Sequence, residues 1–282
     1  FIGYFAYYHT PFDNADELSP ASVQHHGSYL TSFAKYFGNM PMDTLEKAPN
    51  AVYFNTLGYN MAWYPGAWVR PLMYLSIAFY LAVLAVGMAR KRLCIMCVLL
   101  GLGLALLVFA LSVGFVGGIH ALAYKSRTFY MLYMTYWYAA GALCMGAGLI
   151  WMLHGPLARR IGYVNAAMGA ILPWIALGCA ASIYMPGASY AQHWPAFGAL
   201  LGVLGCLFAR DPEKPSPALW IWLAACSLPG LLILSNGARL LVHALSGGIG
   251  GPLAVGFMAL LFGALLTALG PSVSLWLSAW RE

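Results

Sequence analysis

The chain has 282 residues, of which 62% are hydrophobic and 8% are charged, and its mean hydropathy is +0.74. These values exclude an ordinary soluble domain and indicate a polytopic membrane protein. The net charge of +6 does not predict a nucleic-acid partner, because the basic residues cluster between apolar stretches, where membrane topology explains them.

The acidic residues divide the chain into two unlike parts. Five of the eight lie within the first 50 positions, and none lies between Glu46 and Asp211. The chain begins with Phe1, without the charged stretch and cleavage site of a signal peptide. We therefore expect it to be the C-terminal part of a longer protein.

Residues 1–8 predict a short strand, because they are rich in β-prone aromatic side chains and end at a Thr-Pro turn. This strand would deliver His9 to a loop. Ser19-Pro20 then has the pattern of a helix N-terminus, and apolar residues follow at three- or four-residue spacing. An amphipathic helix is expected to end at Gly38-Asn39.

Residues 41–70 predict a linker, since they mix Pro, Asn and Gly with six tyrosine, tryptophan and phenylalanine side chains. Aromatic residues of this kind favour the membrane interface. We expect this linker to lie on the lipid headgroups.

About seven apolar stretches are long enough to cross a bilayer core of ~30 Å, which needs about 20 helical residues. Abundant glycine and alanine would allow these helices to pack closely. A piece between the last two, residues 235–251, is ambiguous because it holds many glycines and the polar pair Arg239 and His243; we expect it to be re-entrant or interfacial. The predicted spans are 72–89, 93–123, 129–153, 161–185, 190–208, 217–234 and 253–269.

The loops predict the orientation. Eight lysine and arginine residues lie in one set of loops and three in the other, and the richer set faces the cytoplasm in most membrane proteins. Residues 1–70 are therefore expected on the non-cytoplasmic side. The chain has no Asn-x-Ser/Thr sequon, which favours a bacterial periplasm over an endomembrane lumen.

The segment around His9 carries the candidate site. The residues Tyr8-His9-Thr10-Pro11-Phe12-Asp13-Asn14, followed by Ser22-Val23-Gln24, resemble the last metal-ligand segment of the di-zinc aminopeptidases, metallopeptidase family twenty-eight. Residues 51–65 are similar to the connector of its membrane-embedded members, which are related to the endoplasmic reticulum metallopeptidase. Asn14 departs from the family pattern, which has threonine there, but asparagine can serve as a turn or cap residue.

The resemblance implies that His9 binds one of two zinc ions. Neutral imidazole is a good zinc ligand, and two adjacent zinc ions can generate a hydroxide and polarise a carbonyl. Thr10 and Asp13 would orient His9 or brace its loop, although Asp13 could equally cap a local turn. The other ligands and the general base are expected upstream, so this fragment alone should be inactive.

Other polar residues have simpler interpretations. His25 and His26 point about 100° apart on a helix and should face solvent. Cys94 and Cys97 have the Cys-x-x-Cys spacing but no second pair, so we interpret them as packing residues, with redox or lipidation chemistry as the alternative. His120 and His154 lie near span ends, where snorkelling or capping explains them.

Together these features predict a membrane domain of about seven helices, residues 71–282, after a linker, residues 41–70. Residues 1–40 would be the last strand and helix of an α/β zinc exopeptidase. The expected function is hydrolysis of peptides outside the cytoplasm. The alternative is a multi-pass transporter or a membrane scaffold, although transporters usually place carboxylates inside the bilayer, and the predicted spans contain none.

Overall fold

The computed structural model describes residues 14–41, 48–56, 60–124, 155–210 and 216–244. Within these ranges, residues 112, 116–124, 155 and 234–244 are described by their backbone alone. The chain divides into two compact units, Phe1–Pro49 and Asn50–Glu282. Each unit is described by itself.

The first unit contains a short 3-10 helix, η1 (Ala15–Glu17), and a long helix, α1 (Pro20–Gly38). The Asn14 side chain accepts hydrogen bonds from the backbone N–H groups of Asp16 (3.0 Å) and Glu17 (3.2 Å), so asparagine caps this turn. Helix α1 begins with Pro20 in its first turn and ends at Gly38, which confirms the predicted helix. The Ser19 side chain, however, makes no capping hydrogen bond.

Helix α1 exposes its apolar side chains. Leu30 is 71% exposed and Phe33 59% exposed, and every described residue of the helix is classed as exposed. An amphipathic helix of a globular protein normally buries such a face. Within the described residues of the first unit, nothing covers the apolar face of α1.

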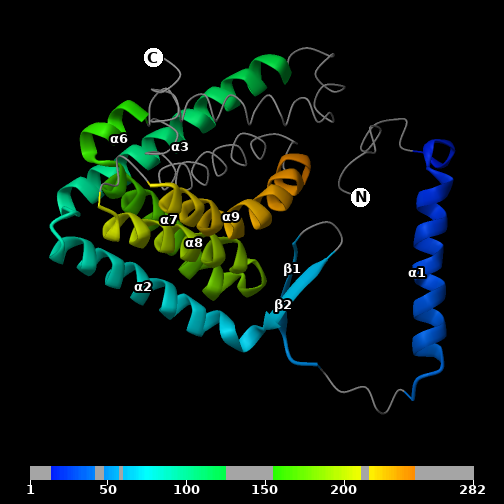
Figure 1. The fold of residues 1–282 in the computed structure, drawn as a ribbon. Helices are drawn as coiled ribbons and strands as arrows, with labels where there is room; N and C mark the ends of the chain where they lie inside the picture. The colour runs from blue at the N-terminus through cyan, green and yellow to red at the C-terminus, as the bar shows by residue number, and fades with distance from the viewer. Residues whose placement is uncertain (1–13, 42–47, 57–59, 125–154, 211–215, 245–282) are drawn as a thin grey trace. The chain divides into compact units, whose positions relative to one another are not determined.

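A β-hairpin begins the second unit. Strands β1 (Ala51–Asn55) and β2 (Met61–Pro65) pair antiparallel, with Ala51 opposite Pro65. Successive side chains of a strand point to opposite faces; Val52 and Tyr64 are buried, while Tyr53 and Trp63 are more than 60% exposed. The segment that we expected to be a linker thus contains a folded hairpin (Figure 1).

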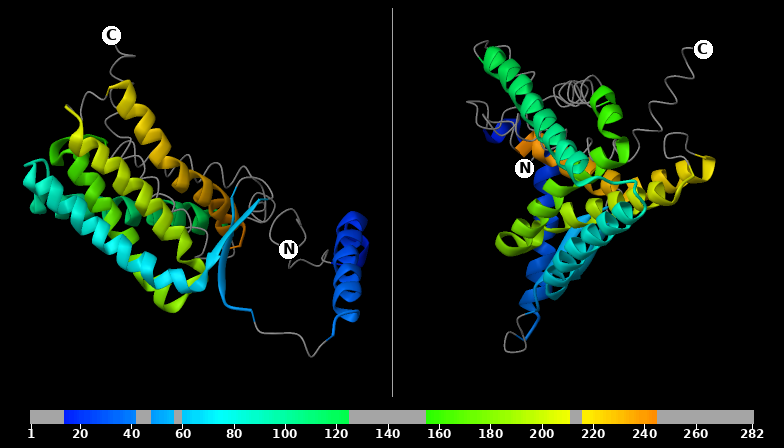
Figure 2. Two further views of the ribbon diagram at one scale, coloured as in Figure 1. Left: turned by 60° about the horizontal axis from the view of Figure 1, so that its bottom comes forward. Right: turned by 90° about the vertical axis from the view of Figure 1, so that its left-hand side faces the viewer.

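The rest of the described second unit is helical. Two 3-10 turns, η3 (Gly66–Trp68) and η5 (Pro186–Ala188), precede helices α2 and α8. The helices are α2 (Val69–Ala89), α3 (Ile95–Tyr124), α6 (Gly155–Ile161), α7 (Tyr163–Tyr184), α8 (Tyr190–Phe208) and α9 (Pro217–Ala244). They pack as a bundle in which α7 contacts both α3 and α8, while α2 and α9 also lie against α8 (Figures 1 and 2).

Four segments within the described residues are long and apolar enough to cross a membrane: Gly66–Ala89, Ile95–Phe115, Tyr163–Tyr184 and Tyr190–Phe208. They agree with four of the predicted spans and confirm that this part of the chain is helical, with helices long and apolar enough to cross a membrane. A shorter apolar helix, Pro217–Ile233, is the start of α9. The predicted spans 129–153 and 253–269 lie outside the described residues.

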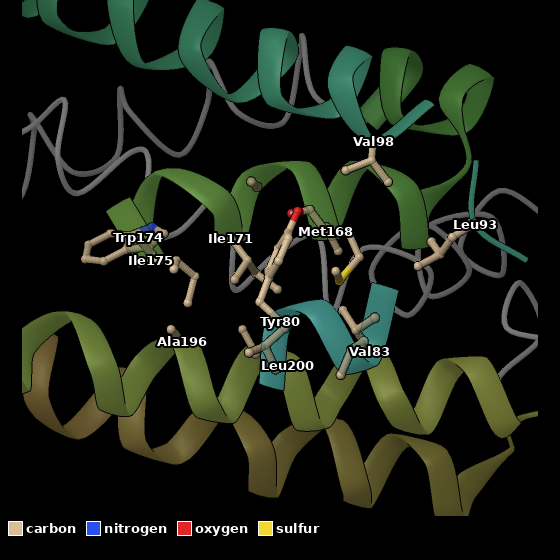
Figure 3. Packing of buried hydrophobic residues seen from close by; sticks show 14 of the residues in the cluster. Tyr80, Val83, Leu93, Val98, Met168, Ile171, Trp174, Ile175, Ala196 and Leu200 are labelled. Atoms are coloured by element: carbon tan, nitrogen blue, oxygen red, sulfur yellow. The ribbon is translucent and has the colours of Figure 1, made fainter. Parts of the chain in front are cut away.

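Helices α7 and α8 form the centre of the bundle. Met168, Ile171 and Leu200 are fully buried, and Tyr80 of α2 packs among them (Figure 3). The Tyr80 hydroxyl donates to the Met168 carbonyl (3.3 Å), which joins α2 to α7. The large apolar side chains on the outer faces of α2 and α3, such as Leu75 and Leu106, are about half exposed and suit contact with lipid.

Glycine permits the closest helix crossing. A Cβ at Gly169 of α7 would collide with the backbone of Val98 and Leu102 on α3, and a Cβ at Gly101 would come within 2.8 Å of the Ala166 Cα. The two helices therefore meet backbone to backbone. This is expected in a membrane, where the hydrophobic effect does not drive helices together and small residues allow close packing instead.

The bundle has two chemically different ends. At one, which we call the basic end, Arg92 of the α2–α3 turn donates to the carbonyls of Cys206 (3.1 Å) and Arg210 (3.2 Å) at the end of α8. Arg159 of α6 donates to the Tyr163 hydroxyl (3.0 Å) at the start of α7. At the other, the hairpin end, β1 and β2 lie against η5 and the start of α8.

Helix α9 continues into the segment that the sequence left ambiguous. Its backbone is helical as far as Ala244, so residues 235–244, with Arg239 and His243, belong to a helix. The remaining part, 245–251, lies outside the described residues.

Candidate functional site

The residues of the predicted zinc segment, His9, Thr10 and Asp13, lie outside the described residues. The described residues begin at Asn14, six residues before α1. Arg239 and His243 lie one turn apart on the α9 backbone, but their side chains, like that of His120, are not among the described ones. His154 also lies outside the described residues.

His25 and His26 lie on α1 and are both exposed, with their ring centroids 6.3 Å apart. This confirms that the pair faces solvent. Ser22, Val23 and Gln24, which carry part of the family resemblance, occupy the first turns of the same helix and are exposed.

The described bundle brings together one buried polar pair that sequence analysis missed, His193 of α8 and Ser182 of α7. His193 is only 1% exposed and Ser182 4% exposed. The His193 Nε2 atom lies 2.8 Å from the Ser182 Oγ. Gly178, one turn before Ser182, makes room for the ring, since a Cβ there would come within 2.9 Å of His193 Cε1.

The Ser182 hydroxyl has one proton and two acceptors within hydrogen-bond distance, the Gly178 carbonyl (2.8 Å) and His193 Nε2 (2.8 Å). When the proton points to the carbonyl, His193 Nε2 donates to Ser182 Oγ; when it points to the ring, Nε2 accepts. In both tautomers His193 Nδ1 is buried without a hydrogen-bond partner among the described residues.

A serine nucleophile with a histidine base has a third group that orients the ring, and no such group bonds to His193 Nδ1 among the described residues. The indole N–H groups of Trp174 and Trp194 and the amide oxygen of Gln192 are also buried without partners among the described residues.

Tyr64 of β2 lies at the hairpin end of this region. Its ring meets Trp194 edge-on at 6.5 Å, and its buried hydroxyl lies near the Ser189 hydroxyl, which donates to the Pro186 carbonyl (2.7 Å). Burial raises the pKa of Tyr64, with the Ser189 hydroxyl opposing that shift and Tyr190 adding to it. Tyr64 is therefore neutral at neutral pH, and its buried hydroxyl makes no hydrogen bond within the described residues.

The signal that could have identified His193 was its position in an apolar span, since polar residues within a bilayer are costly and commonly mark a functional or packing site. Its partner Ser182 is 11 positions away on another helix, and no spacing rule within one helix links them.

No group of three or more histidine, cysteine, aspartate or glutamate side chains is placed to hold a metal ion within the described ranges. The predicted zinc ligand His9 lies beyond them. Comparison of the chain with protein-family models, with curated proteins and with solved structures finds no match in any of the three. The resemblance to the di-zinc aminopeptidases therefore stays a prediction.

Proposed function

We propose that this chain is the C-terminal part of a membrane-bound, zinc-dependent peptidase that acts as an aminopeptidase. The peptidase domain would act on peptides on the non-cytoplasmic side. The helices of the second unit would anchor it in the bilayer.

The observation that carries this proposal is the arrangement of the first unit. The motif from Tyr8 to Asn14 is followed by a capped turn and then by α1, whose apolar face is uncovered among the described residues. A closing helix of an α/β domain has this property, because its apolar stripe packs on a sheet. The described part of the resemblance, the capped turn and α1, thus presents a surface that suits a larger domain.

His9 would supply its imidazole to one of two zinc ions in that domain. A ligand at the end of a strand is held by the rigid sheet behind it. The metal ions would supply a bound hydroxide and polarise the scissile carbonyl. Thr10 and Asp13 would orient the His9 ring or brace its loop, as hydrogen-bonding neighbours of metal ligands commonly do.

The hairpin supports the anchoring part of the proposal. Phe54 of β1 stacks on Tyr190 of α8 with ring centroids 4.4 Å apart, which fixes the hairpin to the helices. Tyr53, Trp63 and Trp68 remain more than half exposed, as suits rings at a membrane interface. A rigid hairpin at the membrane interface would hold the residues that precede it close to the bilayer surface.

The alternative function, a transporter or a scaffold without catalytic activity, has one described feature in its favour. The buried pair His193 and Ser182 places a titratable ring within the bundle. The described helices of the second unit contain no carboxylate to couple with it, whereas proton-coupled transporters rely on such groups. We therefore prefer the anchor.

The test uses the full-length protein in detergent and a soluble peptide with a free N-terminus. His9→Ala should lower peptide turnover by at least about 100-fold, since removing even a hydrogen-bonding neighbour of a ligand costs 10- to 100-fold. His25→Ala, which changes an exposed histidine of α1, is the matched control and should retain turnover. Wild-type turnover in His9→Ala would show that the assignment is wrong.

A further inference from the structure

Cys94 and Cys97 occupy the start of α3 at the basic end. The Cys94 carbonyl accepts the first helical hydrogen bond, from Val98 N–H (2.9 Å), so Cys94 is the N-cap residue and Cys97 lies one turn further on. Cys94 is exposed and Cys97 half-buried. The interpretation of Cys94 as a packing residue is therefore wrong.

The turn that carries Cys94 contacts both α2 and α7. The Cys94 backbone N–H donates to the Asn165 side-chain oxygen of α7 (3.0 Å). Just before it, Arg92 and Leu93 donate their N–H groups to the Gly87 carbonyl (2.9 and 3.1 Å), and the Leu93 side chain is buried against Gly87. These contacts place Cys94 at the N-terminus of α3.

The pKa of the Cys94 thiol lies below its ordinary value, because the Cys97 backbone N–H and then the Cys97 thiol favour its ionised form. The unsatisfied N–H groups and the dipole of a helix N-terminus favour an anion at this point. Cysteines of this kind react at lower pH than free thiols.

We propose that Cys94 and Cys97 form a thiol–disulfide exchange site that reacts with low-molecular-weight disulfides in the compartment facing the basic end. Residues three apart in a helix have Cβ atoms about 5–6 Å apart, and a disulfide needs about 3.5–4.5 Å. A small adjustment at the exposed N-cap residue closes that difference. This inference is independent of the proposed peptidase activity.

The exchange consumes one disulfide and two thiols. The Cys94 thiolate attacks one sulfur of the disulfide, forms a mixed disulfide and releases the first thiolate. Cys97 then gives its proton to solvent, and its thiolate attacks the Cys94 sulfur. The second thiolate leaves, so that Cys94 and Cys97 end oxidised as a disulfide and the small molecule ends reduced to two thiols. Reduced thiol in excess reverses both steps.

The test incubates the detergent-solubilised protein with mixtures of oxidised and reduced glutathione, blocks the remaining thiols and analyses the peptides by mass spectrometry. The wild-type peptide containing both cysteines should lose two hydrogen atoms reversibly. Cys97→Ser should accumulate a glutathione adduct on Cys94, whereas Cys94→Ser should leave the half-buried Cys97 unmodified. Cys179→Ser, in the middle of α7, is the control and should behave as the wild type.

Three results would overturn the proposal. One is that both cysteines stay reduced in the most oxidising mixture. Another is that Cys97 forms the adduct in preference to Cys94. The third is that oxidation joins Cys206 of α8 to Cys226 of α9 and spares the pair at the start of α3.

Discussion

At the residue scale, the buried hydrogen bond between His193 and Ser182 leads to a specific prediction. Ser182→Ala leaves His193 Nε2 buried without a partner, and an orphaned buried polar group costs about 1–3 kcal/mol. His193→Leu removes the ring, while the Ser182 hydroxyl can still donate to the Gly178 carbonyl. Ser182→Ala should therefore destabilise the protein by about 1–3 kcal/mol.

The double variant Ser182→Ala with His193→Leu tests this reasoning. It should be more stable than the sum of the two single changes predicts, because no buried polar atom of the pair is left without its partner. Thermal unfolding in detergent measures the four free energies. Strict additivity would show that His193 and Ser182 do not form a hydrogen bond.

At the level of single residues, sequence analysis could predict only the properties that depend on neighbouring positions in the sequence. It placed His25 and His26 in solvent because neighbouring helical positions diverge. It misjudged Cys94, because the burial of a residue at the start of a helix depends on the elements that cover it. Among the described residues, Cys94 is exposed. It missed His193, whose partner comes from another helix.

At the element scale, the crossing of α3 and α7 depends on Gly169. Gly169→Ala would push the added Cβ into the backbone of Val98 and Leu102, and overpacking of this kind costs about 1–3 kcal/mol. The variant should lower the unfolding temperature. Gly103→Ala on the same α3 helix is the control, since a Cβ there meets nothing within 4 Å, and it should be neutral or stabilising. Equal unfolding temperatures for the two variants would contradict the close crossing.

The sequence could predict the helices that have a long apolar stretch or a proline at the expected helix N-terminus. Helix α8 spans the predicted residues 190–208, and α1 begins at the predicted proline. The hairpin was missed because residues 41–70 were interpreted by their aromatic content, although Tyr53 and Trp63 are paired neighbours in it. The length of α9 was missed because glycine in the segment 235–251 argued against a helix.

At the scale of the whole second unit, all loops that the structure places at the basic end carry arginine. Arg90 lies over the Phe208 ring at 4.4 Å, and Arg92 bonds to the end of α8. The excess of positive charge in these loops predicts that the basic end faces the cytoplasm. The hairpin end would then face outward.

Labelling in intact cells tests this orientation. In a background without native cysteines, single cysteines at Asn55 and Pro186 should react with a membrane-impermeant maleimide when the outer membrane is permeabilised. A cysteine at Arg210 should react only after cell lysis. All three positions are exposed, so differences report sidedness. Labelling of the Arg210 position in intact cells, with protection of the other two, would reverse the orientation.

The central claim is that His9 binds zinc in the peptidase domain, and the zinc content of the purified full-length protein tests it most directly. We expect about two zinc ions per chain in the wild type, as in two-metal hydrolases, the same value in His25→Ala, and a loss of at least about one ion in His9→Ala. Unfolding of the membrane helices should be unchanged in all three. A wild type without bound zinc, or a His9→Ala variant that retains the wild-type zinc content, would contradict the account.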